Sequence, residues 1–213
     1  MSIRRDRLLI TVQGRWNVKD ERSRVCPVEH SRVLDNGVRA WLQNPRRVLA
    51  PHIGEGMTAL DLGCGPGFFT LEMARLVGPS GWVIACDVQQ GMLNKVREKI
   101  HGTAFEARVV PHLCRGNAIG VTEPVDFALA FYVVHEIPDQ AALFTELARI
   151  LKPEGRLLVV EPSFHVSAAA FEKSLALASE AGFVTRQESK GLLSRTALLT
   201  RRPEAFRLRQ QWG

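Results

Sequence analysis

The sequence predicts a doubly wound α/β fold in which a mostly parallel, seven-stranded sheet ends in an antiparallel hairpin. Strand-like and helix-like segments alternate from Met57 onward, a pattern typical of a parallel sheet with helices on both faces. Strand candidates such as residues 82–86 are short and continuously apolar, as buried parallel strands are. Residues 188–194 are too few to cross over between parallel strands, so the strand candidates on either side of them should be antiparallel neighbours.

Each element is expected from its own pattern, in chain order. The first strand begins at Met57, and the helix after it carries Phe69, Met73 and Leu76 on one face before Gly78-Pro79 ends it. The later strand candidates are residues 82–86, 108–112, 125–132, 156–160, 183–187 and 196–200. The later helical stripes are Met92, Val96 and Ile100; Leu143, Leu147, Ile150 and Leu151; and Phe171, Leu175 and Ala178. Residues 152–155, Lys-Pro-Glu-Gly, should end the second of these helices, and Gly182 should cap the third.

The chain divides into one main domain, a segment before it and a short tail. Residues 1–22 are polar and irregular, and form an N-terminal extension for which no order is predicted. Residues 23–50 should be helical, because Leu34, Val38, Trp41 and Leu42 recur at helical spacing until Pro45 breaks the pattern. Residues 51–202 form the main domain and residues 203–213 the tail.

Composition and charge narrow the classes of protein. The 213 residues, 46% of them hydrophobic, suffice for one substantial core. The net charge of +6 is concentrated at the ends, since residues 1–25 carry +4, residues 26–182 carry −3 and residues 183–213 carry +5. The middle of the chain is therefore slightly acidic, and a nucleic-acid partner is not expected.

The cysteines and the N-terminus give no sign of export or of metal binding. Cys26, Cys64, Cys86 and Cys114 form no Cys-x-x-Cys pair, so neither a disulfide framework nor a metal site is predicted. The apolar run at residues 8–12 is too short for a signal-peptide core or a membrane span. We therefore expect a cytoplasmic protein with no membrane partner; its oligomeric state cannot be deduced from these patterns.

A glycine-rich loop follows the first strand candidate, with the sequence Leu60-Asp61-Leu62-Gly63-Cys64-Gly65-Pro66-Gly67. Glycine at every second position lets the backbone turn sharply and approach a ligand, and the helix that opens there offers unpaired N–H groups. An acidic residue, Asp87, ends the next strand candidate and could accept both hydroxyls of a ribose. The spacing differs from the Gly-x-Gly-x-x-Gly of dinucleotide sites, which disfavours an oxidoreductase. The loop predicts a site for a nucleoside cofactor.

With Asp61 closing the first strand, this loop resembles motif I of the class I S-adenosylmethionine-dependent methyltransferases, which have a Rossmann-like fold. The resemblance covers roughly residues 46–201. The compact format and the segment 151–156, Leu-Lys-Pro-Glu-Gly-Arg, look most like the quinone-type and metalloid-type small-molecule branch. The resemblance implies S-adenosylmethionine as the cofactor and S-adenosylhomocysteine as the product, and it makes residues 23–50 a lid that contributes to the substrate pocket.

The resemblance also implies which residues meet the cofactor. Asp61 would lie near its ammonium group, and the backbone of Gly63, Cys64, Gly65 and Gly67 would pack against its methionine and ribose parts. Asp87 would hold the ribose hydroxyls, although it could instead cap the following helix. The remaining candidates are Val88, Gln89, Met92, Asn117, Ala118 and Phe131. Among these, Asn117 stands where many relatives have an acidic residue that reads adenine, and its amide oxygen can accept the same hydrogen bond, whereas Met92 could equally be a core residue.

Two histidines are the candidate catalytic residues. His135 follows the fourth strand, in a loop that faces the transferable methyl group in the family, and imidazole titrates near operating pH. It is therefore the candidate general base, unless it only shapes the turn at Pro138. Glu136 could orient it, but a solvated acid is the preferred interpretation. His165 follows the fifth strand and is the second candidate.

The other histidines are given lesser roles. His52, His101 and His112 are expected to be structural. Cys26 and His30 could join His135 and His165 around a metal only if the N-terminal segment crossed the pocket, and they lack compact ligand spacing.

The sequence thus predicts an S-adenosylmethionine-dependent methyltransferase that acts on a small-molecule acceptor. The amino-methylating signature, Asn/Asp-Pro-Pro-Tyr, is replaced by Phe131-Tyr132-Val133-Val134, so the acceptor atom should be carbon, oxygen or sulfur. Two alternatives stay open. An RNA methyltransferase is supported only by the basic ends, and a noncatalytic S-adenosylmethionine-binding module would have the same cofactor loop.

Overall fold

The computed structural model describes residues 44–115, 118–191 and 193–203, and within them seven strands form one sheet in the order β3-β2-β1-β4-β5-β7-β6. The strands are β1 (Thr58–Leu62), β2 (Trp82–Asp87), β3 (Val109–Leu113), β4 (Val125–Phe131), β5 (Leu151–Pro162), β6 (Phe183–Lys190) and β7 (Ser194–Arg201). The helices are α3 (Pro45–Leu49), α4 (Thr70–Leu76), α5 (Gln90–Ile100), the short 3₁₀ helix η3 (Val134–Glu136), α6 (Gln140–Ile150) and α7 (Ala168–Glu180). β1 to β5 pair in parallel, and β7 is antiparallel to both β5 and β6. The predicted fold class is confirmed.

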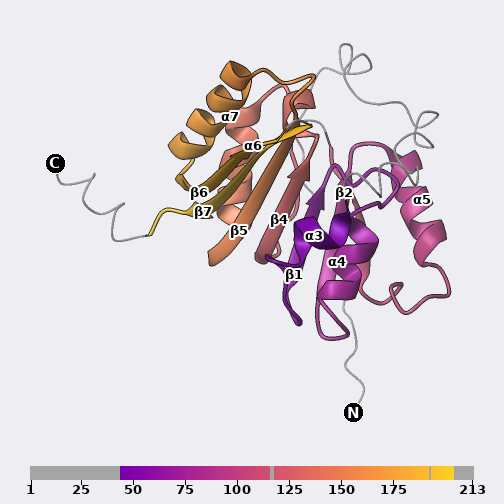
Figure 1. Ribbon diagram of the computed structural model, residues 1–213. Helices are drawn as coiled ribbons and strands as arrows, with labels where there is room; N and C mark the ends of the chain where they lie inside the picture. The colour runs from indigo at the N-terminus through magenta and orange to yellow at the C-terminus, as the bar shows by residue number, and fades with distance from the viewer. Residues whose placement is uncertain (1–43, 116–117, 192, 204–213) are drawn as a thin grey trace.

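The sheet is covered on both faces, as Figure 1 shows. Alternate residues of each strand enter different apolar clusters: Ala59, Val83 and Phe127 join the cluster that holds residues of α3, α4 and α5. Their strand neighbours, such as Leu60 and Ile84, join the cluster that holds residues of α6 and α7. Both faces of the central strands are therefore buried, which is why these strands read as continuous apolar runs.

Three helix ends are marked by glycine, proline or asparagine residues. Gly78, just after α4, and Gly182, just after α7, both have positive φ, the conformation that ends many helices. Pro45, expected to break an upstream helical pattern, is the first residue of α3, where its missing N–H costs nothing. Asn44 caps this helix by accepting hydrogen bonds from the N–H groups of Arg46 and Arg47. The stripe of Leu34, Val38, Trp41 and Leu42 lies outside the described residues.

The start of β5 corrects the sequence prediction. Leu151 was expected in the helical stripe and residues 152–155 at the helix end, but α6 ends at Ile150 and β5 begins at Leu151. β4 advances by two residues, from Val125 to Phe127, while β5 advances by five, from Leu151 to Arg156, so the segment is an irregularity inside the strand. The Lys152 ammonium binds both oxygens of Asp126 on β4, which holds this irregular segment against the sheet.

The C-terminal hairpin is longer than predicted. Residues 188–194 were expected to link the two strands, but β6 continues to Lys190 and β7 starts at Ser194. Most residues of β6 are exposed, and the strand forms an edge of the sheet. Backbone pairing with β7 forms this strand, although its sequence has no apolar pattern from which a strand of this length could be predicted.

Across the ranges that the structure describes, no helix combines the length and the apolar character needed to cross a membrane.

Candidate active site

The candidate site lies at the carboxyl ends of the parallel strands. The chain order of the strands reverses between β1 and β4, and ligands of open α/β sheets bind outside such a switch point. The glycine loop follows β1, and Asp87 ends β2. His135 follows β4, and Glu161 is the last residue but one of β5. The topology therefore brings most of the predicted site residues to one edge of the sheet.

The three glycines of the loop have positive φ for different structural reasons. A Cβ on Gly63 would lie 2.5 Å from Cγ2 of Val133, so glycine there allows the loops after β1 and β4 to touch. A Cβ on Gly67 would lie 3.2 Å from Cγ2 of Val96, so glycine there allows close packing on α5. A Cβ on Gly65 would meet no described atom within 4 Å. Gly65 alone of the three turns its bare face to open space, where a ligand can approach.

Asp87 connects the ends of β1 and β2. Its Oδ2 accepts a hydrogen bond from the Gly65 N–H at 2.9 Å, and its Oδ1 accepts one from the Gln89 N–H at 2.8 Å. Burial raises the pKa of the Asp87 carboxyl, and the hydrogen bonds from Gln89, Gly65 and Val88 oppose that shift. Each carboxylate oxygen has a second acceptor site. The same carboxylate can therefore fix the glycine loop and still accept a hydrogen bond from a ligand hydroxyl.

Asp61 is buried beneath the glycine loop. Its carboxylate accepts a hydrogen bond of 2.6 Å from the hydroxyl of Thr70, the first residue of α4. Burial raises the pKa of Asp61 to about 7, against the opposing effect of this hydrogen bond. Asp61 thus joins the end of β1 to the helix that starts behind the loop.

The other predicted cofactor residues are dispersed around this edge. Cys64 is buried and its N–H binds the Cys86 carbonyl, Met92 is buried on α5, and Val88 is 49% exposed. Phe131, at the end of β4, has its ring centroid 4.3 Å from that of Phe69, which precedes α4. Their contacts with a cofactor stay predictions.

The loop after β3 is held in place by a distant helix. Glu146 of α6 accepts hydrogen bonds from the N–H groups of Ile119 and Gly120, at 2.8 and 2.7 Å. A ring nitrogen of His112 lies 2.8 Å from the Ile119 carbonyl oxygen, which agrees with its expected structural role. Ala118 begins the described part of this loop, and Asn117 lies outside the described residues, as do Cys26 and His30.

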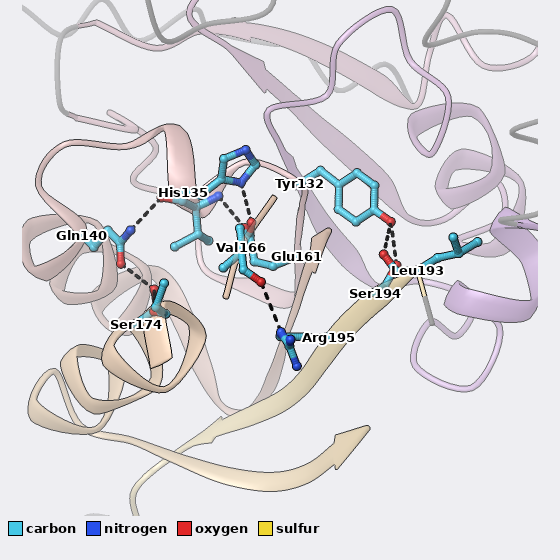
Figure 2. A network of polar contacts seen from close by, with 11 residues as sticks. Tyr132, His135, Gln140, Glu161, Val166, Ser174, Leu193, Ser194 and Arg195 are labelled. Atoms are coloured by element: carbon cyan, nitrogen blue, oxygen red, sulfur yellow. Dashed lines mark hydrogen bonds and ion pairs between the residues drawn. The ribbon is translucent and has the colours of Figure 1, made fainter. Parts of the chain in front are cut away.

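His135 is paired with a carboxylate that the sequence did not assign to the site. Its Nδ1 forms a hydrogen bond with Oε2 of Glu161, as Figure 2 shows. Glu161 is only 1% exposed, and its Oε1 accepts a hydrogen bond of 2.9 Å from the Val134 N–H. The hydrogen bond with Glu161 is the main cause of a raised pKa at His135. His135 is thus a half-buried imidazole whose charged form is stabilised by a buried acid.

The turn that carries His135 is held from its other side by an amide. Gln140, at the start of α6, donates a hydrogen bond of 3.0 Å from Nε2 to the Val134 carbonyl. The Ser174 hydroxyl of α7 donates to Oε1 of the same amide at 2.7 Å (Figure 2). Both backbone groups of Val134 are therefore fixed by side chains.

Tyr132 leaves β4 in a constrained conformation. Its φ of 59° is the only positive value among the described residues other than glycine. Its hydroxyl lies 2.6 Å from Oγ of Ser194, the first residue of β7. The tyrosine thus ties the end of β4 to the C-terminal hairpin, just before the turn that carries His135.

His165 and Glu136 differ in how they approach His135. The rings of His135 and His165 meet edge to face with centroids 5.0 Å apart, so the two candidate catalytic residues lie together. Glu136, interpreted from the sequence as a solvated acid, is partly buried, and burial raises its pKa to about 7. The residue that orients His135 is Glu161 rather than Glu136.

Sequence reasoning missed Glu161, Gln140 and Ser174. Glu161 had a detectable signal, because it is an acid that directly follows the apolar run Leu157–Val160, as Asp87 follows the apolar run of β2. Gln140 and Ser174 had none, since each looks like an ordinary polar residue of an amphipathic helix.

The chain is similar in sequence to known proteins. Residues 53–195 match a family model described as a methyltransferase domain. The chain is 31% identical over 153 residues to a demethylmenaquinone methyltransferase of Lactobacillus johnsonii, which covers 69% of this chain and 61% of that protein. It is 35% identical over 112 residues to the ubiquinone/menaquinone biosynthesis C-methyltransferase UbiE of Pasteurella multocida, which covers 51% of this chain and 41% of that protein. The aligned parts thus span about half the length of these relatives.

The fold is similar to that of a solved structure. That structure is described as a SAM-dependent methyltransferase from Aquifex aeolicus, with a TM-score of 0.72 and 25% sequence identity. The similarity covers 82% of this chain and 98% of that one.

Proposed function

The chain belongs to the methyltransferase domain family, and from this premise we propose that it transfers the methyl group of S-adenosylmethionine to a small-molecule acceptor. The names of the relatives mention menaquinone and ubiquinone, and we infer from them a quinone-type acceptor that reacts in its hydroxyaromatic form. The proposal places the cofactor over the glycine loop, in a domain of residues 51–202, with residues 23–50 contributing to the acceptor pocket. Three free thiols, Cys64, Cys86 and Cys114, support a reducing, cytoplasmic location.

One observation carries the proposal: the Asp87 carboxylate is hydrogen-bonded to the N–H of Gly65, a glycine whose missing Cβ would meet no described atom within 4 Å. The hydrogen bond from the Gly65 N–H to Oδ2 of Asp87 fixes the distance between the glycine loop and the carboxylate. A nucleoside placed along the loop would present its ribose hydroxyls to Asp87, and a carboxylate is an acceptor with no competing donor. Gly65 leaves room for the ligand because no described atom would contact a Cβ there.

The reaction needs little covalent chemistry from the protein. S-adenosylmethionine, when bound over the glycine loop, would supply an activated methyl group, which the acceptor nucleophile would take while the electron pair of the carbon–sulfur bond returned to sulfur. The proton that the acceptor loses is taken up by His135. The protein holds nucleophile and methyl group in line and supplies this base.

A binding titration tests the cofactor assignment. Asp87→Ala should weaken S-adenosylhomocysteine binding by about 1.5 to 3 kcal/mol, because charge-assisted hydrogen bonds to the ribose are lost. The matched control is Asp126→Ala, which also removes a carboxylate that accepts a backbone N–H, from Thr58, but away from the loop. Calorimetry that shows equal affinities for the two variants would refute the ribose role of Asp87.

An acceptor screen tests the activity. The full chain is incubated with methyl-labelled S-adenosylmethionine and a panel of phenols, quinols, thiols, arsenite and RNA. We expect label in a hydroxyaromatic product. Label in RNA alone, or tight cofactor binding with no turnover on any acceptor, would contradict the proposal.

A further inference from the structure

The buried carboxylate of Glu161 makes two hydrogen bonds with described residues, and both partners belong to the turn that carries His135. Oε1 accepts the Val134 N–H, and Oε2 binds Nδ1 of His135. Glu161 is 1% exposed, on a strand with a neighbour on each side, so the carboxylate position is set by the sheet. We propose that Glu161 is a positioning residue that holds His135 as its Nδ1–H tautomer, leaving Nε2 as the base that removes a hydroxyl proton from the acceptor.

The tautomer follows from the inventory of donors. An ionised carboxylate has no proton to donate, so the hydrogen bond between Glu161 and His135 requires the proton to be on Nδ1. In the neutral imidazole the other nitrogen, Nε2, is then an acceptor. The Val134 N–H fixes the second carboxylate oxygen, so Glu161 cannot rotate away without leaving a buried donor unpaired.

The charges around His135 raise its pKa, which suits a base that takes a proton from a weakly acidic acceptor. Glu161 from β5 and Glu136 from the same turn both raise the pKa of His135, burial lowers it, and His165 from the segment after β5 contacts the ring edge. A base with a raised pKa suits a hydroxyl group that must lose its proton as the methyl is transferred. A thiol is already a strong nucleophile near neutral pH and gains little from such a base.

This inference rests on the proposed function and narrows its acceptors to molecules that carry a hydroxyl group. Proton transfer goes from the acceptor hydroxyl to Nε2, while the electron pair of the broken carbon–sulfur bond stays on sulfur. His135 becomes a cation next to the Glu161 carboxylate and later returns the proton to solvent. Hydroxyl-bearing acceptors are expected to depend on Glu161, and thiol or metalloid acceptors are not.

The test replaces the carboxylate with an amide of the same shape. In Glu161→Gln the carbonyl oxygen can still accept the Val134 N–H, and the NH₂ group then faces Nδ1 of His135. Nδ1 can accept a hydrogen bond from this NH₂ group only if the ring proton moves to Nε2. Nε2 then carries a proton and can no longer act as the base. The matched control is Glu154→Gln, the same substitution at an exposed position of β5.

Nitrogen NMR of the full chain, with labelled histidine, reads the tautomer without any substrate. The His135 resonances are assigned by their loss in His135→Ala. In the wild type and in Glu154→Gln, His135 should show a protonated Nδ1 and a bare Nε2, and in Glu161→Gln the pattern should invert. Titration should also give a lower pKa for His135 in Glu161→Gln than in the wild type.

Kinetics supply the second readout. With a hydroxyl acceptor, kcat should fall about 10²- to 10⁴-fold in Glu161→Gln, while cofactor affinity changes less than about twofold. A wild-type His135 with its proton on Nε2 overturns the proposal, whether or not the variants fold. So does an unchanged kcat in a folded Glu161→Gln. A wild-type Nδ1–H tautomer without turnover on any acceptor would refute the proposed function while leaving the positioning by Glu161 in place.

Discussion

The two halves of the candidate site are built from different materials. The half at β1 and β2 is made largely of backbone: the glycine loop, with one carboxylate, Asp87, accepting two backbone N–H groups. The half at β4 and β5 is made of side chains, with Glu161, Gln140 and Ser174 arranged around the turn of His135. The first half follows from a glycine motif and the acid that ends the next strand, 22 positions from Gly65. The second half joins residues of a turn, a strand and two helices that share no sequence motif.

This difference suggests a division of labour. A backbone site tolerates changes in neighbouring side chains and binds one invariant cofactor, while a side-chain site can be altered residue by residue to suit an acceptor. Variants in the second half should therefore change turnover, and variants in the first half should change cofactor affinity.

The largest effect is expected at His135. His135→Ala should lower turnover about 10²- to 10⁴-fold, equivalent to about 2.7 to 5.4 kcal/mol, with cofactor affinity nearly unchanged. The base must be neutral to act, and the pKa of His135 is raised above its ordinary value of 6.5. The wild-type rate should therefore rise with pH around a midpoint above 6.5, and this rise should vanish in the variant. His101→Ala, at the exposed end of α5, serves as the control. Turnover within a few-fold of the wild type would reject the base role and erase the functional contrast between the halves.

An intermediate effect is expected in the glycine loop. Gly65→Ala should weaken S-adenosylhomocysteine binding about 10- to 100-fold, or about 1.4 to 2.7 kcal/mol, because the added methyl occupies the open face. The control is Gly102→Ala, since Gly102 also has positive φ and no described atom within 4 Å of a Cβ, but follows the far end of α5. Both variants should lose a similar free energy of unfolding, about 1 to 2 kcal/mol. Equal cofactor affinities in calorimetry would show that Gly65 does not face the ligand.

The smallest effect is expected at Ser174. Ser174→Ala removes the donor that fixes the Gln140 amide, and the free energy of unfolding should fall by about 1 kcal/mol. Turnover should fall by a few-fold, because Gln140 holds the Val134 carbonyl less firmly, while cofactor affinity stays constant. Denaturant unfolding and steady-state kinetics measure the two effects, with the exposed Ser189→Ala as control. A change in cofactor affinity would show that the halves are coupled.

The fold was predictable because its determinants are local. Buried parallel strands leave apolar runs, and Gly78 and Gly182 mark helix ends where the sequence placed them. The errors occurred where pairing, rather than burial, forms a strand. Leu151 begins β5 because it pairs with Val125 of β4, and residues 188–190 lie in β6 because β7 pairs with them.

The candidate site was predictable where a sequence motif marks it. Asp87 and Gly65 could be connected from their motif, and the structure places them 2.9 Å apart through a hydrogen bond. His135 could be proposed from its place after β4. Glu161 could be noticed as an acid at the end of an apolar run, but its pairing with His135 could not be predicted, because no sequence motif links the two residues. Parallel strands bring together residues that are distant along the chain, and no periodic pattern records such a pair.

The order of strands in the sheet has a consequence for how the chain assembles. β7 is the last strand in the sequence, yet it lies between β5 and β6. During synthesis, β5 therefore lacks its second neighbour, and β6 lacks any neighbour, until residues 194–201 have emerged. Strands β1 to β4, by contrast, have one another as partners once residues 125–131 have emerged. The sheet around the glycine loop can therefore form before β7 is made, whereas the strand that carries Glu161 gains its second neighbour only when residues 194–201 have emerged.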